Sequence, residues 1–311
     1  MTVIRYCSEH SSIWDEFVVN SKNANFHLTR KFLAYHKNRF EDHSVLVFNS
    51  NNELVTLIPA HVNGENICSH SGLTYGGFVF SKERMLTENM QAMQLVFEYY
   101  RSQGYQSIYY KTIPHIYHSI PSEDDLYFLF LQKAELICRH VNPVIRPTLK
   151  SEYQERRLRM IKKALKQGVL VSKSAQVDSY WKIVEELLAN YNTKPVHSLE
   201  EMRQLMDLFP ENIRLYGAFL NEELIAGILV FETDLVCKFQ YIAANDKAKS
   251  IGALDLLIDY LIQKEFPNKT IDFGTVTADS GKQFAEGLSN QKEGFGARAT
   301  IQDHYVVFLQ T

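Results

Sequence analysis

The chain has 311 residues, of which 45% are hydrophobic and 22% are charged, and its formal net charge at pH 7 is -3. This length and composition predict a folded protein of about two domains rather than a disordered chain. The nearly balanced charge gives no global attraction to nucleic acid or to an anionic membrane, so we expect no DNA partner.

The residues that form metal sites and disulfides show no suggestive spacing. The four cysteines include no C-x-x-C pair, and the eleven histidines form no H-E-x-x-H, so we expect neither disulfides nor a metal site. The N-terminal MTVIRYCSEH does not resemble a signal peptide, and no apolar run has the length of a transmembrane helix. We therefore expect a cytoplasmic protein without a transmembrane segment.

The first half of the chain predicts a mixture of helices and strands that begins and ends with a strand. Hydrophobic periodicity and turn residues give, in order, a strand at 3–6, a helix around Ile13 to Phe17, a helix from Thr29 to Phe40, and strands at 44–50, 53–62, 65–70 and 76–80. A helix with Met90, Met93, Phe97 and Tyr100 on one face follows, then a strand at 107–112. Ser122 and Asp125 are expected to cap a further helix, and 135–145 to close the first sheet.

The second half predicts the same kinds of element in a similar order. The first is a basic helix at 152–167 that ends at Gly168, followed by a strand at 169–171, a helix carrying Trp181, Val184 and Leu188, and a helix that begins with a capping box of Ser198 and Glu201. Three strands follow, at 213–220, 224–232 and 235–243. The rest of the chain predicts a helix carrying Ile251, Leu254, Ile258 and Leu261, a strand at 269–274, a helical piece at 281–292, and a last strand at 300–310.

The repeated order of elements indicates an internal duplication. The apolar spacing of the helix after Met90 matches that of the helix after Ile251. We place the boundary near Pro147, which interrupts a strand, and predict domains 1–148 and 149–311. The alternative is that any mixed α/β protein yields such echoes.

The tripeptide Asp272-Phe273-Gly274 does not indicate a protein kinase. A kinase D-F-G needs an upstream H-R-D loop and a glycine-rich loop over the phosphates, and the sequence contains neither. The tripeptide is therefore the end of a strand, followed by a turn glycine.

Three stretches carry a resemblance to a known family: ERRLRMIKKALKQGV, IDFG and GLSNQKEGFGA. The element order of each half is similar to that of the Gcn5-related N-acetyltransferase (GNAT) fold, and two such halves joined by a basic helix resemble the FemABX-type tandem acyltransferases. The resemblance implies an α/β (α+β) fold with two tandem GNAT-like domains and mixed, mainly antiparallel central sheets. KPVHSLEEM and FQYIAAN resemble the bacterial branch found with cell-surface polysaccharide genes.

The resemblance also implies a site for an acyl-CoA co-substrate. In this fold the strands that correspond to 235–243 and 269–274 splay apart, which frees backbone donors for the acyl carbonyl and pantetheine. The next helix offers its N–H groups to a pyrophosphate. The fold's Q/R-x-x-G-x-G/A pattern is matched only in part, with Leu254 in place of a small residue. The candidate cofactor-binding residues are Gln240, Lys249, Ser250, Ile251, Gly252 and Ala253. The alternative is an ordinary helix N-terminus with solvated lysines.

Four residues are candidates for catalysis. His197 has a side chain that titrates near neutral pH and is a candidate base, or it bonds locally before Ser198. Tyr241 either reaches the tetrahedral centre or lies in the core. Asp272 ends a strand, where it acts as a base or pairs with Lys292. The resemblance places Lys292 where the peptidyl branch of the family uses a lysine to stabilise developing negative charge.

The acceptor is expected to bind a loop and the first domain. The resemblance places the loop 191–198, with Tyr191 and Lys194, over the open strands. In the first domain, the stretch Thr74-Tyr75-Gly76-Gly77 lets a ligand approach the backbone closely at its glycines, or it makes a hairpin or bulge. No glycine begins the long helix of this domain. We therefore expect the first domain to shape an acceptor groove and the second to carry the chemistry.

The basic helix 152–167 has three interpretations. Six cations lie within eleven residues, and they contact tRNA phosphates, contact a nucleotide-linked sugar, or form a solvated face between domains. Aromatic residues of the kind that stack on RNA bases do not alternate with them.

The functional hypothesis is an acetyl-CoA-dependent N-acyltransferase that acylates an amine of a cell-envelope or polysaccharide precursor, an amino sugar, by direct attack and without a metal. The acceptor is a small molecule or a lipid- or nucleotide-linked sugar. One alternative is a FemX-type peptidyltransferase that uses aminoacyl-tRNA and a peptidoglycan precursor. Another is a non-catalytic binding protein that retains the fold.

Overall fold

The computed structural model describes residues 1–36, 39–149 and 151–309 and divides into two compact units. The first unit contains Met1–His140, Asp279–Lys282 and the last strand from Ile301 onward. The second unit contains Val141–Ala278 and Gln283–Thr300. The predicted domains, 1–148 and 149–311, stay a prediction, as does the expectation that the second of them carries the chemistry.

The first unit has a long helix and short strands. Its helices are α1 (Ser11–Asn20), α2 (Arg30–Leu33), α3 (Leu86–Ser102) and α4 (Asp124–Leu131). Its strands are β1 (Thr2–Arg5), β2 (Glu41–Asp42), β3 (Val45–Phe48), β4 (Leu54–Ile58), β5 (His61–Asn63), β6 (Asn66–Cys68), β7 (Val79–Phe80) and β8 (Ser107–Lys111). One buried core joins the apolar face of α3 to these strands.

The second unit has longer strands. Its helices are α5 (Glu155–Lys166), α6 (Val177–Ala189), α7 (Leu199–Leu208), α8 (Asp246–Ile251), α9 (Ala253–Tyr260) and α10 (Glu286–Glu293). Its strands are β10 (Leu170–Ser174), β11 (Ile213–Leu220), β12 (Glu223–Glu232), β13 (Val236–Ala244), β14 (Thr270–Asp272), β15 (Thr277–Ala278) and β16 (Gln283–Phe284). Two further strands, β9 (Glu135–Ile145) and β17 (Arg298–Phe308), begin in one unit and end in the other.

The sheet of the second unit is covered on both faces. Strands β10 to β13 pair antiparallel in chain order, and β13 then pairs with β14 in parallel. Ala226 and Ile228 of β12 share a buried core with Leu257 of α9, whereas Gly227 between them lies against Tyr180 of α6. Because alternate residues of a strand face opposite sides, α6 and α9 cover opposite faces.

The two halves exchange their last strands. In the first unit β6 pairs with β8 in parallel and β8 pairs with β17, which comes from the end of the chain. In the second unit β14 pairs with Val144 and Ile145 of β9, which comes from the first half. We expected 135–145 to close the first sheet and 300–310 the second. The register shows instead that each strand supplies pairing residues to the other half.

Three local predictions need correction. The helix expected through Ile251 is broken into α8 and α9, because Gly252 has a φ of 83°. The helix expected from Thr29 to Phe40 shortens to α2 and a 3-10 turn at Ala34–His36; residues 37–38 lie outside the described chain. Ser122 does not cap α4, whose N-cap residue is Glu123. The predicted capping box of Ser198 and Glu201 is confirmed.

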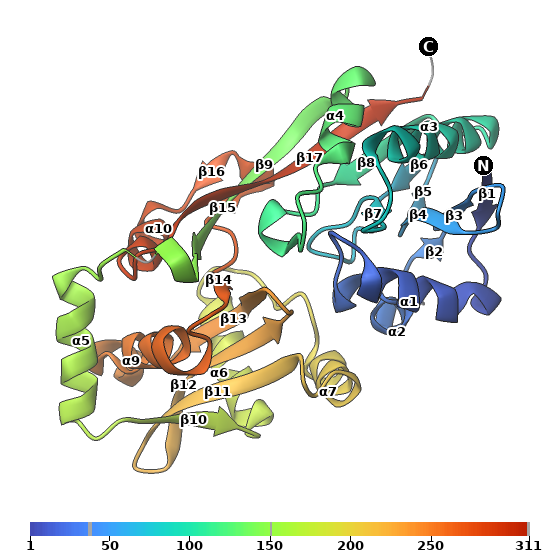
Figure 1. Ribbon diagram of the computed structural model, residues 1–311. Coiled ribbons are helices and arrows are strands. Elements are labelled where there is room, and N and C mark those ends of the chain that lie inside the picture. Colours follow the sequence, from blue (N-terminus) through green and yellow to red (C-terminus); the bar gives the residue numbers. More distant parts are fainter. Residues whose placement is uncertain (37–38, 150, 310–311) are drawn as a thin grey trace. The chain divides into compact units, whose positions relative to one another are not determined.

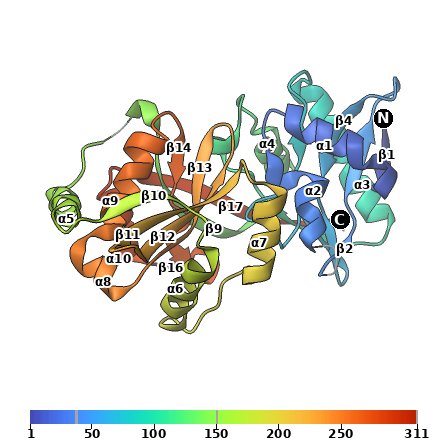
Figure 2. The ribbon, with the colours of Figure 1, turned by 90° about the horizontal axis from the view of Figure 1, so that it is seen from below.

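The linker helix α5 packs against α9, and Figures 1 and 2 show the two side by side. Arg157 of α5 and Asp255 of α9 form a buried ion pair of 2.6 Å. The backbones of the two helices also approach closely at Gly252. A Cβ atom added to Gly252 would lie only 2.4 Å from the carbonyl oxygen of Met160. Gly252 is therefore required both for its backbone conformation and for the contact with α5.

We predict that Gly252→Ala destabilises the protein more than Gly168→Ala does. Both glycines have positive φ, so alanine costs about 1–2 kcal/mol at each. Only Gly252 has backbone atoms in the space of the new Cβ, since nothing lies within 4 Å of that position at Gly168. The clash adds about 1–3 kcal/mol. Urea-induced unfolding measures both variants, and equal losses of unfolding free energy would contradict this account of Gly252.

Candidate active site in the second unit

The candidate site begins where β13 and β14 stop pairing. The parallel register joins Val236–Lys238 to Thr270–Asp272 and goes no further among the described residues. The rest of β13 still pairs with β12, so its other edge is left without a partner strand. Backbone groups along this edge are therefore in position to bind a ligand's amide or carbonyl groups.

A bulge in β13 lies at the start of this open edge. Leu229 is opposite Tyr241 while Val230 is opposite Phe239, so Gln240 is the extra residue. The side-chain oxygen of Gln240 is buried and has no hydrogen-bond partner among the described residues. An acceptor left in this state costs about 1–3 kcal/mol. A ligand N–H that reached this oxygen would recover that energy.

His197 and Tyr241, both predicted for catalysis, contact each other. Nδ1 of His197 lies 2.8 Å from Oη of Tyr241, and the backbone N–H of His197 donates to the same oxygen at 3.2 Å. The capping box holds His197 immediately before α7. Burial raises the pKa of the Tyr241 hydroxyl, and the backbone N–H of His197 partly offsets this. The tyrosine is thus a neutral hydroxyl that orients the imidazole.

A second cluster consists of Lys238, Asp272 and Lys292. The β13–β14 register places Lys238 directly beside Asp272. Nζ of Lys292, which comes from α10, donates to the carbonyl oxygens of Gly274 at 2.9 Å and Thr275 at 3.2 Å. Asp272 is 1% exposed, and its Oδ1 accepts the backbone N–H of Gly274 at 2.8 Å. Two ammonium groups thus accompany one carboxylate at the end of β14.

The charge of this cluster is sensitive to pH. Burial lowers the pKa of Lys292 to about 8; the carboxylate of Asp272 opposes this shift and the ammonium of Lys238 adds to it. Burial also lowers the pKa of Lys238, again opposed by Asp272. An ammonium has three N–H donors, and the two carbonyls account for two of those on Lys292. The third is available to an oxygen that gains negative charge during a reaction.

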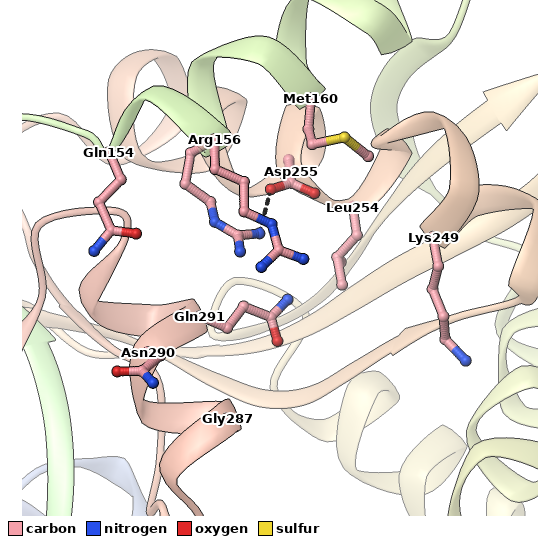
Figure 3. Close-up of a pocket in the computed structure, with 10 residues that line it drawn as sticks. Gln154, Arg156, Met160, Lys249, Leu254, Asp255, Gly287, Asn290 and Gln291 are labelled. Carbon is pink, nitrogen blue, oxygen red and sulfur yellow. Dashed lines mark hydrogen bonds and ion pairs between the residues drawn. The ribbon is translucent and has the colours of Figure 1, made fainter.

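A cationic pocket of about 400 Å³ lies between α5, α9 and α10. In Figure 3, Arg156 enters it from α5 and Gln154 from the position just before that helix, Asn290 and Gln291 enter from α10, and Lys249 lies at the far end. Its volume falls within the range of small-molecule sites. Nε of Arg157 is buried there without a hydrogen-bond partner among the described residues, although another nitrogen of this guanidinium binds Asp255. The charges suit a phosphate-bearing ligand.

The predicted pyrophosphate loop is only partly open. Lys249 lines the pocket and pairs with Asp246 at 3.0 Å, whereas Ser250 donates its hydroxyl to the carbonyl of Lys247. Ile251 packs against the core of the unit, and Ala253 is fully buried. Gly252 faces Met160, as described above. A role in binding for these loop residues stays a prediction.

The predicted acceptor residues have different surroundings. Tyr75 is 1% exposed and its hydroxyl lies 2.9 Å from Nδ2 of Asn25, while a Cβ on Gly76 would lie 2.1 Å from the carbonyl oxygen of Ser69. Both therefore serve packing in the first unit, and a role in binding stays a prediction. Tyr191 is 71% exposed and Lys194 is also exposed, so both are accessible at the loop before α7.

Sequence reasoning missed Lys238 and the pocket residues Arg156 and Arg157 as parts of a site. A lysine inside the apolar run LVCKFQYIA, two residues before Gln240, was a usable signal. The two arginines were noted only as members of a basic helix. Their position depends on the packing of α5 against α9, which no local pattern encodes.

Comparison with known proteins supports the fold and the kind of enzyme. A family model described as "Acetyltransferase (GNAT) domain" matches residues 152–279. A search of curated proteins found no match. No helix in the described part of the chain is long and apolar enough to cross a membrane.

Solved structures of low sequence identity share the fold over nearly the whole chain. FemX is 11% identical with a TM-score of 0.67, covering 97% of each chain. The C-terminal domain of a putative lysylphosphatidylglycerol synthetase from Agrobacterium fabrum is 12% identical with a TM-score of 0.60, covering 97% of this chain and 93% of that chain. A tandem GNAT protein from the clavulanic acid biosynthesis pathway is 10% identical with a TM-score of 0.52, covering 100% and 99%.

The family match and the fold agree with the element order, the open edge of β13 and the bulge at Gln240. Residues 152–279 match the acetyltransferase (GNAT) domain model, and nearly the whole chain shares the fold of FemX and of a tandem GNAT protein.

Proposed function

We propose that the protein is an N-acyltransferase that uses acetyl-CoA or another acyl-CoA and acylates an amine of a cell-envelope or polysaccharide precursor, an amino sugar, in the cytoplasm. The observation that carries the proposal is the open, bulged edge of β13, with the unpartnered oxygen of Gln240 beside it. Pantetheine contains amide N–H groups that suit this oxygen. The cationic pocket between α5, α9 and α10 suits the phosphates of the same carrier.

The proposed reaction is a direct attack of the acceptor amine on the acyl carbonyl. The new C–N bond forms through one tetrahedral intermediate, the C–S bond then breaks, and the thiolate leaves with a proton. His197, held by Tyr241, takes the proton from the attacking amine. Lys292 donates its third N–H to the oxyanion. Asp272, buried beside both lysines, keeps them charged and fixes their position rather than acting as the base.

A second donor, aminoacyl-tRNA, is favoured by a specific feature of α5. Its exposed face carries a row of cations that lie outside the pocket, including Arg159 and Lys162. Such a row suits the phosphates of a long polyanion better than those of one coenzyme. The fold is also shared with FemX and with a putative lysylphosphatidylglycerol synthetase domain. The acceptor in this case would be a peptidoglycan precursor.

Calorimetric titration with acetyl-CoA separates the two donors. We expect micromolar binding that Arg156→Ala weakens by about tenfold, since one charge-assisted hydrogen bond to phosphate is worth about 1.5 kcal/mol at an exposed site. Arg159→Ala is the matched control, because it removes the same charge from the same helix outside the pocket. No detectable binding of acetyl-CoA, with charged tRNA binding that both variants weaken, would replace the acyl-CoA proposal with the tRNA one.

Lys292→Ala should lower kcat by roughly 10²-fold, because the oxyanion loses a preorganised donor. The measurement is steady-state turnover of the folded variant with whichever donor binds. Lys264→Ala, which removes an exposed lysine of the same unit, should leave turnover unchanged. Normal turnover in a folded Lys292→Ala protein would exclude this role.

The kcat of the wild-type enzyme should fall as the pH rises through about 8. Lys292 stabilises the oxyanion only as an ammonium, which is populated below its lowered pKa of about 8. In Lys292→Arg the charge persists, because a guanidinium does not lose its proton in this range. The alkaline fall should therefore vanish in that variant, at reduced overall rate. An identical fall in both proteins would assign it to another group.

A further inference from the structure

A cluster of metal-ligand side chains lies in the first unit, outside the candidate active site. Cys138 and His140 are two residues apart on β9 and share one face of the strand. His304 is on β17, the neighbouring strand. One ligand atom from each of the three residues lies within 4.8 Å of the other two. Sγ of Cys138 is 3.3 Å from Nε2 of His140.

The surroundings of His304 leave one ring nitrogen available. Nδ1 of His304 lies 2.7 Å from Oη of Tyr109, on β8. Nε2 is buried and has no hydrogen-bond partner among the described residues, and the side chain is only 7% exposed. When Nδ1–H donates to the tyrosine oxygen, Nε2 carries the lone pair that a metal requires. Metal-binding histidines are commonly oriented by such a bond from their second nitrogen.

We propose that Cys138, His140 and His304 bind a divalent transition-metal ion of the zinc class. Zn²⁺ takes thiolate sulfur at about 2.3 Å and imidazole nitrogen at about 2.0–2.1 Å. Ligand atoms at these distances in a tetrahedron are about 3.5 Å apart. The separation of 3.3 Å between Cys138 Sγ and His140 Nε2 is close to that value, and all three ligand atoms lie within 4.8 Å of one another. Three protein ligands leave the fourth position for water or an anion. This site departs from the expectation, from spacing alone, that the chain binds no metal.

Three charged residues, Lys111, Arg139 and Asp303, lie near the cluster. Lys111 is paired with His304 in the β8–β17 register. Its ammonium is held by backbone carbonyls, at 2.8 Å from that of Leu73 and 3.3 Å from that of Ser71. Burial and the carboxylate of Asp303 raise the pKa of the Cys138 thiol, and the ammonium of Lys111 opposes that shift, so the thiol gives up its proton when it binds the ion. The guanidinium of Arg139 forms a bidentate ion pair with the carboxylate of Asp303.

The ion would join β9 to β17. These are the two strands that continue from one unit into the other. A metal held by both strands would fix them to each other within the first unit. The site is independent of the acyl-transfer site, all of whose residues are in the second unit.

Cobalt binding tests the proposal directly. The full-length protein is stripped with a chelator, dialysed against Co²⁺, and examined by absorption spectroscopy. We expect one Co²⁺ per chain, with a sulfur-to-cobalt charge-transfer band that Zn²⁺ abolishes by displacement. Cys138→Ser should lose the band. Cys68→Ser is the matched control, because Cys68 is a cysteine of the same unit with the same exposed fraction of 5%. No band in the wild type, or equal bands in both variants, would overturn the proposal.

Two further variants keep the test decisive if Cys138→Ser does not fold. His140→Gln removes a ligand that is only partly buried and should weaken Co²⁺ binding by at least tenfold. Tyr109→Phe removes the hydroxyl that orients His304 and should cost 10–100-fold in affinity. Zn²⁺ should also raise the melting temperature of the wild type more than that of His140→Gln. Unchanged affinity in both variants would exclude the site.

Discussion

The candidate active site depends on the point at which β13 and β14 stop pairing. A fully paired sheet would use every backbone donor and acceptor of β13 within the protein. Because pairing ends at Lys238 and Asp272, one edge of β13 stays available, and the bulge at Gln240 changes which side chains lie beside it. The groups proposed for catalysis come from segments on either side of this opening: His197 before α7, Tyr241 on β13, and Lys292 on α10.

Charge is concentrated where the sheet is incomplete. Burial penalises an isolated ammonium strongly, and Lys238 and Lys292 are tolerated because Asp272 and two backbone carbonyls accompany them. Burial outweighs the carboxylate of Asp272, so the pKa of Lys292 is lowered to about 8. A group poised in this way responds to small changes of charge nearby, which is the property expected of a residue that stabilises a transient anion.

The linker helix α5 has two roles in the second unit. Its buried arginine and close backbone contact hold α9 in place, and its neighbouring side chains line the cationic pocket. The space beside Gly252, where a pyrophosphate was expected to bind, is filled by the backbone of Met160. Our proposal therefore assigns the phosphates of the acyl carrier to side chains that line this pocket, and the pocket is where the identity of the carrier can be tested.

Most helices and strands of the second unit, the capping box at Ser198 and the end of β14 could be predicted without a structure, because these features follow from periodicity and local hydrogen bonds. The sequence also nominated His197 with Tyr241, and Asp272 with Lys292, as members of one site. Only the tertiary structure decided the exchange of β9 and β17, the burial of Tyr75, the break at Gly252 and the meeting of Cys138 and His140 with His304. These depend on contacts between residues far apart in the chain, and such contacts leave no periodic signal in the sequence.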